Sequence, residues 1–316
     1  MAITRRDLLK GAAVAGAATA LAGKAEAREA VQPLPDAVGM LFDATRCVGC
    51  RACVTRCKEA NELPYDRTPD GQYDAPNDLN GTTKNIIKAH PAGDSQTYMK
   101  QQCMHCVDPS CVSVCMMGAL HKEAQGKRLM KGERSVATGI VLWDKDLCVG
   151  CRYCQIGCAF NVPKFEWDDA FPKIVKCELC RHRGDPKKEG PLAVANPACC
   201  EACPREAVIY GRRAELLAEA KRRVAAEPER YEAKVYGEHD GGGTQVLYLA
   251  PKGVEFTALG LPVLPERSSA EFSEKVSHAP YLHGLTPIAL YAGLAFVIHR
   301  NRKKEEAAEH GPEGKR

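Results

Sequence analysis

The sequence predicts an α+β protein made of two tandem, duplicated cysteine-rich units, followed by a C-terminal extension and one transmembrane helix. Three observations lead to this fold class. All 17 cysteines of the 316-residue chain lie between Cys47 and Cys203, in four groups. Short apolar runs of strand-like length flank these groups. Residues 279–298 form an uncharged and mostly apolar run that is long enough for a membrane helix.

The N-terminus has the pattern of an export signal. Paired arginines, Arg5 and Arg6, precede a mildly apolar run from Ala12 to Ala22, and the small-x-small sequence Ala25-Glu26-Ala27 follows. Paired arginines before a weakly hydrophobic run are typical of the twin-arginine route. An ordinary secretory signal would favour leucine over alanine, and an amphipathic helix of alanine and glycine would pack poorly. Residues 1–27 are therefore predicted to be a twin-arginine signal peptide that is not part of the fold.

The four cysteine groups have closely related spacings. Groups one and three share the pattern Cys-x2-Cys-x2-Cys-x3-Cys, group two has a longer interval before its third cysteine, and group four is split by 18 residues. The members are Cys47, Cys50, Cys53 and Cys57 in group one; Cys103, Cys106, Cys111 and Cys115 in group two; Cys148, Cys151, Cys154 and Cys158 in group three; and Cys177, Cys180, Cys199 and Cys203 in group four.

The match between groups one and three extends beyond their cysteines, which indicates an internal duplication. The ends of groups two and four also match in part, with Ala119-Leu120 after one and Ala207-Val208 after the other. Four further residues of group one recur in group three at a constant offset of 101 residues: Asp43, Val48, Gly49 and Arg51 correspond to Asp144, Val149, Gly150 and Arg152.

This spacing is characteristic of cubane iron–sulfur sites. Three thiolates at x2 spacing wrap one cluster, and the fourth thiolate, four positions later, projects away to ligate a second cluster. Four groups therefore predict four clusters. A zinc site made of four cysteines uses two separate Cys-x2-Cys knuckles, and only Cys177 with Cys180 has that form. The odd number of cysteines argues against a disulfide framework.

The cysteine pattern resembles the four-cluster subunits, with bacterial dicluster ferredoxin-like domains, of molybdopterin-oxidoreductase and hydrogenase complexes. The likeness is dense over residues 40–210 and looser over 236–249. It implies that groups one and four share two clusters, and groups two and three the other two. Some relatives with a three-iron cluster carry tryptophan where this chain has Cys151, so four [4Fe–4S] clusters are expected. The implied ligands are Cys47, Cys50, Cys53 and Cys203 for cluster 1; Cys57, Cys177, Cys180 and Cys199 for cluster 2; Cys103, Cys106, Cys111 and Cys158 for cluster 3; and Cys115, Cys148, Cys151 and Cys154 for cluster 4.

Two details depart from the family pattern or leave a choice. Proline usually follows the last cysteine of a group, as Pro204 does, but the other three groups have Lys58, Met116 and Ala159 at this place. The change removes no ligand, because proline restricts only the backbone of the turn. Cys199 and Cys200 are adjacent, and the x3 spacing before Cys203 favours Cys199 as the ligand. Cys200 is then a packed free thiol.

These assignments divide the chain into segments. The first dicluster unit is expected over residues 38–66 and 172–210, with groups one and four, and the second over 99–171, with groups two and three. Residues 67–98 are rich in proline, aspartate, asparagine and glycine, which predicts a surface insert. Residues 211–278 form the C-terminal extension, with helical apolar spacing over 213–226. Short strands are expected at 139–143, 173–176, 207–210 and 244–249.

The C-terminal part predicts a membrane anchor. Residues 279–298 carry no acidic or basic side chain, and a basic run from Arg300 to Lys304 follows. A basic run after an apolar span places the following residues in the cytoplasm. We therefore expect one transmembrane helix over 279–298, a cytoplasmic tail over 299–316, and residues 28–278 on the periplasmic side of the cytoplasmic membrane. Thr286 and Pro287 leave a buried or interfacial helix as the alternative, and His283 is best explained as an interfacial histidine without a role at a quinone or haem.

The sequence indicates electron transfer rather than catalysis. It has no dinucleotide fingerprint, nucleophile elbow or paired carboxylates, so a self-sufficient reductase lacks a cofactor motif. The net charge of +4 is too small to indicate nucleic-acid binding. An export signal together with an anchor makes the chain most similar to the iron–sulfur subunits of the periplasmic hydrogenase-2 type. That resemblance implies a non-catalytic relay from a nickel–iron hydrogenase to a quinone-reactive integral membrane subunit. The alternative is the same relay in a membrane-bound formate dehydrogenase or another molybdopterin oxidoreductase.

Overall fold

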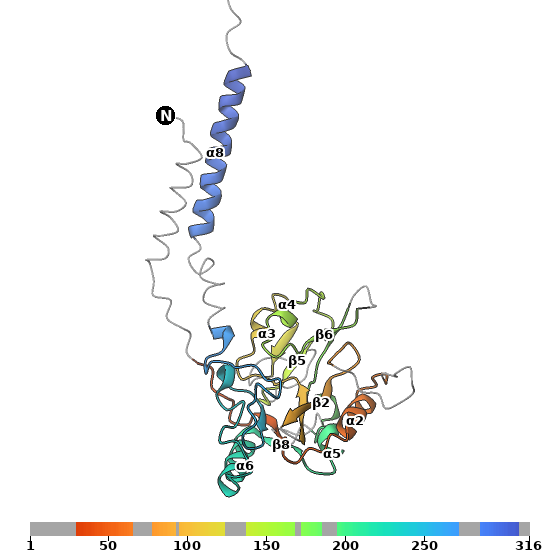
Figure 1. The fold of residues 1–316 in the computed structure, drawn as a ribbon. Helices are drawn as coiled ribbons and strands as arrows, with labels where there is room; N and C mark the ends of the chain where they lie inside the picture. The colour runs from red at the N-terminus through yellow and green to blue at the C-terminus, as the bar shows by residue number, and fades with distance from the viewer. Residues whose placement is uncertain are drawn as a thin grey trace, which may run out of the picture. The chain divides into compact units, whose positions relative to one another are not determined.

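The structure is a computed structural model that describes residues 30–65, 78–92, 95–123, 137–167, 172–184, 195–271 and 285–309. The chain divides into two compact units, and residues 30–270 form the larger of them. In Figure 1 this unit contains the strands and the short helices. All 17 cysteines lie within it. The predicted signal peptide, residues 1–27, lies outside the described residues.

A three-stranded sheet of order β8-β1-β9 joins distant parts of the chain. Strand β1 (Val38–Asp43) pairs antiparallel with β8 (Val208–Arg212) and parallel with β9 (Val246–Leu249). The strands predicted at 207–210 and 244–249 are thereby confirmed. Because β9 comes from the predicted C-terminal extension, that extension completes the sheet that precedes the first cysteine group.

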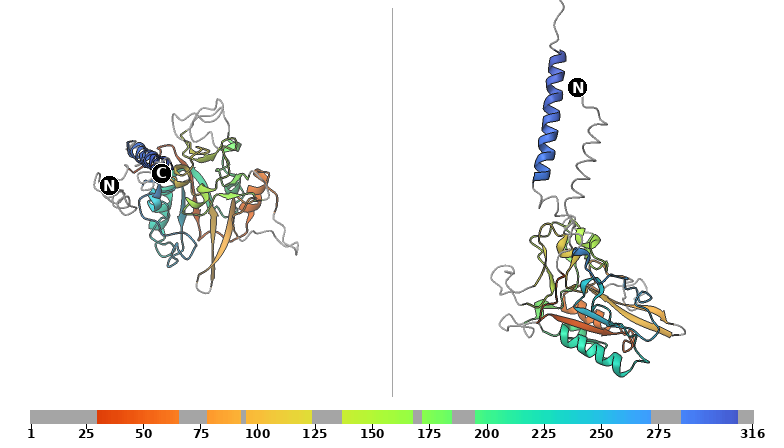
Figure 2. Two further views of the ribbon diagram at one scale, coloured as in Figure 1. Left: turned by 90° about the horizontal axis from the view of Figure 1, so that it is seen from above. Right: turned by 90° about the vertical axis from the view of Figure 1, so that its left-hand side faces the viewer.

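The two faces of this sheet have different neighbours. Helix α6 (Arg213–Ala226) packs on one face, and the right-hand view of Figure 2 shows it (teal) running along the sheet. Side chains alternate between the faces along a strand, so Leu41 and Leu247 pack with α6, whereas Met40 and Tyr248 pack with the buried cysteines. Burying each such apolar side chain contributes about 1.5–3 kcal/mol. The helix predicted over 213–226 is confirmed.

A buried carboxylate ties α6 to the end of β1. Asp43 is fully buried and accepts hydrogen bonds from Arg223 Nη1 at 3.0 Å and from the Tyr231 hydroxyl at 2.9 Å. The backbone amide of Thr45 donates to the same carboxylate at 3.0 Å. A buried charge needs such partners to offset its desolvation. The network therefore fixes the backbone immediately before Cys47, where the first cysteine loop begins.

Two strand pairs in the larger unit have the same register. Trp143 of β5 (Val141–Trp143) lies opposite Leu120 of β4 (Leu120–Lys122), as Phe42 of β1 lies opposite Val208 of β8. Phe42 and Trp143 are related by the sequence offset between groups one and three, and Leu120 and Val208 by the offset between groups two and four. The next backbone hydrogen bonds also match. The amide of Asp43 donates to the carbonyl of Ala207 at 2.7 Å, and the amide of Asp144 donates to the carbonyl of Ala119 at 2.8 Å. The duplication itself stays a prediction, and the shared register agrees with it.

A β-hairpin occupies part of the segment predicted as a surface insert. Strands β2 (Asn85–Ala92) and β3 (Ser95–Gln102) pair antiparallel, with Ile87 opposite Lys100, and form the orange hairpin in Figure 2. Ile86, Ile87 and Met99 are buried in the core that contains the cysteines. The prediction of a surface loop over 67–98 is therefore wrong for residues 85–92 and 95–98. Overall composition hid the short apolar stretches that the two strands bury.

Short elements carry most of the cysteine loops. Each of the four short α-helices contains at least one cysteine, so single helical turns set the positions of these thiols. Strands β5 and β7 lie within the runs predicted as strands at 139–143 and 173–176, which confirms both. The remaining elements are α2 (Ala52–Ala60), α3 (Ser110–Ser113), α4 (Tyr153–Ile156), α5 (Ala198–Glu201), the 3-10 helices η2 (Arg181–Arg183) and η4 (Asp240–Gly242), and the antiparallel pair β6 (Lys164–Phe165) and β7 (Ile174–Val175).

The predicted transmembrane helix over 279–298 is not supported. Helix α8 (Leu285–Glu309) begins inside that span and continues through the basic run that starts at Arg300. Within the described ranges, no helix is both long enough and apolar enough to cross a membrane. Residues 279–284 lie outside the described residues.

Candidate iron–sulfur sites

Left-handed backbone shapes the loops of groups one and three. Gly49 and Arg51 have φ values of 71° and 61°, and the matching residues Gly150 and Arg152 have 70° and 65°. Residues other than glycine seldom adopt this region. A β-carbon on Gly49 would lie 2.3 Å from the ring of Tyr98, so a larger residue does not fit there. The repeated turn folds the chain back on itself between successive cysteines.

The thiols of the first implied set come together beside β1. Cys47 interacts electrostatically with Cys203 and Cys50, and Cys53 interacts with Cys47 and Cys203. All four thiols line one cavity, together with Lys100. The loop before α2 and the turn after α5 therefore meet, although they lie far apart in the sequence.

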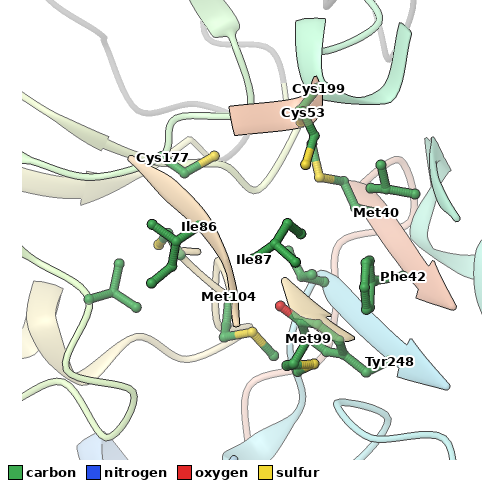
Figure 3. Close-up of a cluster of buried hydrophobic side chains, with 14 of the residues drawn as sticks. Met40, Phe42, Cys53, Ile86, Ile87, Met99, Met104, Cys177, Cys199 and Tyr248 are labelled. Atoms are coloured by element: carbon green, nitrogen blue, oxygen red, sulfur yellow. The ribbon is translucent and has the colours of Figure 1, made fainter. Parts of the chain in front are cut away.

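The second implied set is formed by Cys57, Cys177, Cys180 and Cys199, all of which are buried. Cys177 interacts electrostatically with the other three, and Cys57 also interacts with Cys199 and Cys180. Figure 3 shows Cys177 and Cys199, with Cys53 of the first set, among the buried apolar side chains of the core. Cys53 and Cys57 are one turn apart on α2, yet their thiols belong to different sets.

The third and fourth sets assemble in the same way. Cys106 interacts electrostatically with Cys158, Cys111 and Cys103. Cys154 interacts with Cys115, Cys148 and Cys151. Group three thus contributes its last cysteine to one set and its first three to the other. The structure brings together each set of thiols that the resemblance implies, and their role as cluster ligands stays a prediction.

Cysteines of neighbouring sets also interact electrostatically with one another. Cys53 of the first set interacts with Cys199 of the second, and Cys111 of the third interacts with Cys154 of the fourth. The buried phenol of Tyr248 interacts with cysteines of the second and third sets, Cys177 and Cys103. The four sets therefore form a continuous series in the order first, second, third, fourth.

The thiol sets differ in exposure along this series. All cysteines of the second set are buried, whereas Cys50 of the first set and Cys151 of the fourth are exposed. The apolar residues next to group-one and group-three cysteines, Val48 and Val149, are 53% and 61% exposed. Both ends of the series therefore reach the surface, the second set is buried, and the third set is partly exposed at Cys106, Cys111 and Cys158.

Backbone amides point at several cysteine sulfurs. Leu120 donates to Cys115 Sγ at 3.5 Å, and Ala207 donates to Cys203 Sγ at 3.2 Å. The amide of Leu179 donates to Cys177 Sγ at 3.4 Å. Hydrogen bonds to the sulfurs are one of the means by which a protein tunes the potential of an iron–sulfur cluster. Each of these donors lies two to five residues after its cysteine, so the turn itself supplies the contact.

Burial controls the protonation of the thiols. It raises the pKa of Cys53 to about 12, that of Cys57 to about 11 and that of Cys154 to about 12. In the absence of metal these thiols are protonated at neutral pH. Iron binds the thiolate, so loading the sites releases protons and becomes harder as the pH falls.

The donor set fits iron–sulfur clusters. Every member of the four sets is a cysteine, and soft thiolates are the usual ligands of such clusters. Among the residues that the structure describes, no three His, Cys, Asp or Glu side chains are arranged to hold a single metal ion. A cubane offers four iron atoms, one for each thiolate, so its ligands do not have to meet at one point.

Cys199 and Cys200 differ in exposure, and the choice of Cys199 as the ligand stays a prediction. Cys199 is 4% exposed and lies with Cys57, Cys177 and Cys180, whereas Cys200 is partly exposed. A hydrogen bond with the Cys200 thiol lowers the pKa of Cys199. Cys200 thus supports its neighbour from outside the second set.

Two lysines near the thiols, Lys100 and Lys122, are not indicated as functional by the sequence pattern. Lys100 is 1% exposed; burial by itself would lower its pKa, but electrostatic interactions with Cys199 and Cys53 raise it overall. Lys122 Nζ donates to the Cys106 carbonyl at 2.7 Å. The positions of Lys100 and Lys122 near group two are visible in the sequence, but the burial of Lys100 and the hydrogen bond of the half-buried Lys122 depend on strand pairings that spacing does not predict.

Comparison with known proteins agrees with this geometry. Residues 95–213 match the 4Fe-4S dicluster domain family. The fold and the cysteine sets therefore define an iron–sulfur electron-transfer subunit. The chain is 39% identical to the hydrogenase-2 operon protein HybA of Escherichia coli O157:H7 over 96% of this chain and 97% of that protein. It belongs to the HybA family of hydrogenase-2 iron–sulfur subunits.

Other relatives and the N-terminus extend the comparison. A protein of Nitratidesulfovibrio vulgaris Hildenborough is 37% identical over 94% of this chain and 75% of that protein. The iron–sulfur subunit of the nitrate-inducible formate dehydrogenase of Escherichia coli K12 is 32% identical over 82% of this chain and 83% of that protein. Residues 2–22 match the twin-arginine translocation signal family, which confirms the predicted export signal.

Proposed function

We propose that this chain is the non-catalytic electron-transfer subunit of a periplasmic nickel–iron hydrogenase, and that it delivers electrons to a quinone-reactive integral membrane subunit. The observation that carries the proposal is the convergence of all cysteines except Cys200 into four sets of four. Each set is proposed to hold one [4Fe–4S] cluster: Cys47, Cys50, Cys53 and Cys203; Cys57, Cys177, Cys180 and Cys199; Cys103, Cys106, Cys111 and Cys158; and Cys115, Cys148, Cys151 and Cys154.

When bound, each cluster supplies a site that accepts and returns one electron. The chain's own residues hold the thiolates, donate amide hydrogens to the sulfurs and keep water from the second set. Two tandem dicluster units, 38–66 with 172–210 and 99–171, would arrange the sites in series. Support for this order comes from the contacts Cys53–Cys199 and Cys111–Cys154, and from Tyr248 between the second and third sets.

Each end of the series would face one redox partner. The exposed thiols Cys50 and Cys151 lie in the first and fourth sets. The apolar side chains of Val48 and Val149, which follow cysteines of the same two sets in the sequence, are also exposed. Electrons can then enter at the exposed cluster at one end of the series and leave from the exposed cluster at the other end.

The choice of a hydrogenase follows from the relatives. HybA matches over nearly the whole length of both chains, and its name refers to hydrogenase-2. The export signal agrees with a complex on the periplasmic side. A second candidate is a formate dehydrogenase, because iron–sulfur subunits of that enzyme are 32% identical over more than four fifths of both chains.

Deletion of this chain from its own organism tests the proposal. We expect hydrogen-dependent reduction of membrane quinone to fall to background, because the path between catalytic subunit and membrane is broken. Hydrogen-dependent reduction of a soluble viologen dye should persist in the same extract, since the catalytic subunit does not need this chain to reduce a dye. A plasmid copy of the gene should restore quinone reduction.

The substrate separates the two candidate functions. The same extracts are assayed with formate in place of hydrogen. Loss of formate-dependent quinone reduction, with the hydrogen-dependent reaction intact, would reject the hydrogenase assignment in favour of the formate dehydrogenase. Intact quinone reduction from both donors would contradict the relay function.

A further inference from the structure

Lys100 is a buried cation at the boundary between two thiol sets. It lies in β3 opposite Ile87, is 1% exposed, and its Nζ donates to the side-chain carbonyl of Gln102. The Tyr248 hydroxyl donates to the Lys100 carbonyl at 2.8 Å, which fixes the backbone of the strand at this point. The hydrogen-bond partner of the ammonium is thus a neutral amide.

The charged surroundings of Lys100 are cysteine thiols. It interacts electrostatically with Cys53 of the first set and with Cys57, Cys177 and Cys199 of the second. It also lines the cavity that the four thiols of the first set share. Lys100 therefore faces both sets at once.

No carboxylate neutralises this ammonium among the described residues: Lys100 takes part in none of the ion pairs found there. Lys84 also faces the second set, through Cys180, but lies 3.7 Å from Glu178 and has a nearby counter-charge. Burying an ammonium is costly unless negative charge compensates it. The first and second clusters would supply this negative charge, because each oxidised cluster with its four thiolates carries a net charge of about −2.

We propose that the Lys100 ammonium is a fixed positive charge that raises the reduction potentials of the first and second clusters. This inference rests on the proposed function, because it requires clusters in both sets. Each cluster gains one electron on reduction and becomes more negative by one unit, with no bond broken and no proton moved. A nearby fixed cation stabilises the reduced form more than the oxidised form. Lys100 thus acts on the clusters through its charge and does not bind iron.

The cysteines with which Lys100 interacts belong to the first and second sets, so its effect is expected on those two clusters, and other lysines lie nearer to the third set. Lys122 Nζ donates to the Cys106 carbonyl and Lys176 Nζ to the Cys177 carbonyl, at 2.7 and 3.1 Å. Cys111 of the third set interacts with Lys176. Removing Lys100 leaves these cations in place.

Two neutral variants and one control test the inference in the full chain. Lys100→Met removes the charge and the donor, and Lys100→Gln removes the charge but keeps an amide that can donate to Gln102. Lys88→Met is the control, because Lys88 is on the same hairpin, pairs with Asp78 at 3.2 Å and is a third exposed. Reduction potentials are measured by EPR-monitored redox titration of anaerobically purified protein, with iron counted per chain.

We expect both Lys100 variants to lower the equilibrium constant for reduction of two of the four clusters by about tenfold, which is about 59 mV for one electron. The other two potentials, and all four in Lys88→Met, should not move. The shift should persist in a Cys158→Ser background, where the third cluster is missing.

Unchanged potentials in both loaded variants would overturn the inference, and so would an equal shift of all four clusters. Loss of iron from both Lys100 variants would also overturn it, because the residue would then be needed for assembly. A wild-type chain that lacks four clusters would instead contradict the proposed function, so the two failures are distinguishable.

Discussion

A Cys158→Ser variant is expected to lose the third cluster and to keep the fourth, although three ligands of the fourth lie in the same sequence group. The reason is that the Cys158 thiol interacts with Cys103 across the two groups. Cys106 and Cys111 also interact with Cys158, whereas Cys154 interacts with Cys115 instead. Iron should fall by about four atoms per chain. Quinone reduction should fall to background, because the series is interrupted in its middle.

The matched control for Cys158→Ser is Cys115→Ser. Cys115 is the last cysteine of group two, and its thiol interacts with Cys154 of group three. The two variants should therefore lose different clusters, each in the neighbouring group rather than its own. EPR spectra of the reduced proteins distinguish the losses. If Cys158→Ser removed the cluster of Cys148, Cys151 and Cys154, the crossed arrangement would be wrong.

Replacing Cys199 by serine should remove the second cluster, whereas the same change at the adjacent Cys200 should remove none. Cys199 is buried and interacts with Cys57, Cys177 and Cys180, the other members of the second set. Cys200 is partly exposed, and its hydrogen bond is with Cys199. Serine can make a similar hydrogen bond, so Cys200→Ser retains the contact while it removes the sulfur.

Iron analysis and EPR measure both variants in the same way. We expect about four irons fewer for Cys199→Ser and a full complement for Cys200→Ser. The pair is well matched because the residues are neighbours and the substitution is identical. A full set of clusters in Cys199→Ser, together with a loss in Cys200→Ser, would assign the ligand to the other cysteine.

Much of the candidate site could be predicted because its information is local. The x2 and x3 spacings place cysteines on single turns, and the structure has those turns at α2 and α4. The apolar runs beside them form β5, β7 and β8, as the sequence indicates. The sequence matches of group one with three and of group two with four reappear in the register, where Phe42 lies opposite Val208 and Trp143 opposite Leu120. Local patterns of this kind survive folding because they need no distant partner.

The parts that could not be predicted depend on long-range pairing. Strand β9 joins β1 in parallel, although more than 200 residues separate them, and no local pattern contains that choice. The β2–β3 hairpin lies in a segment whose polar composition suggests a loop, and its pairing buries Lys100. At the C-terminus, hydropathy alone placed a membrane helix at 279–298. The described helix instead starts at Leu285 and runs on into charged residues.

The count of iron and acid-labile sulfide in anaerobically purified, full-length protein tests the four-cluster relay most directly. Four sets of four thiolates predict about sixteen irons and about sixteen sulfides per chain, with EPR spectra of interacting [4Fe–4S] clusters on reduction. About eight irons, or a persistent three-iron signal with iron correspondingly short of sixteen, would contradict the assignment of one cubane to each set.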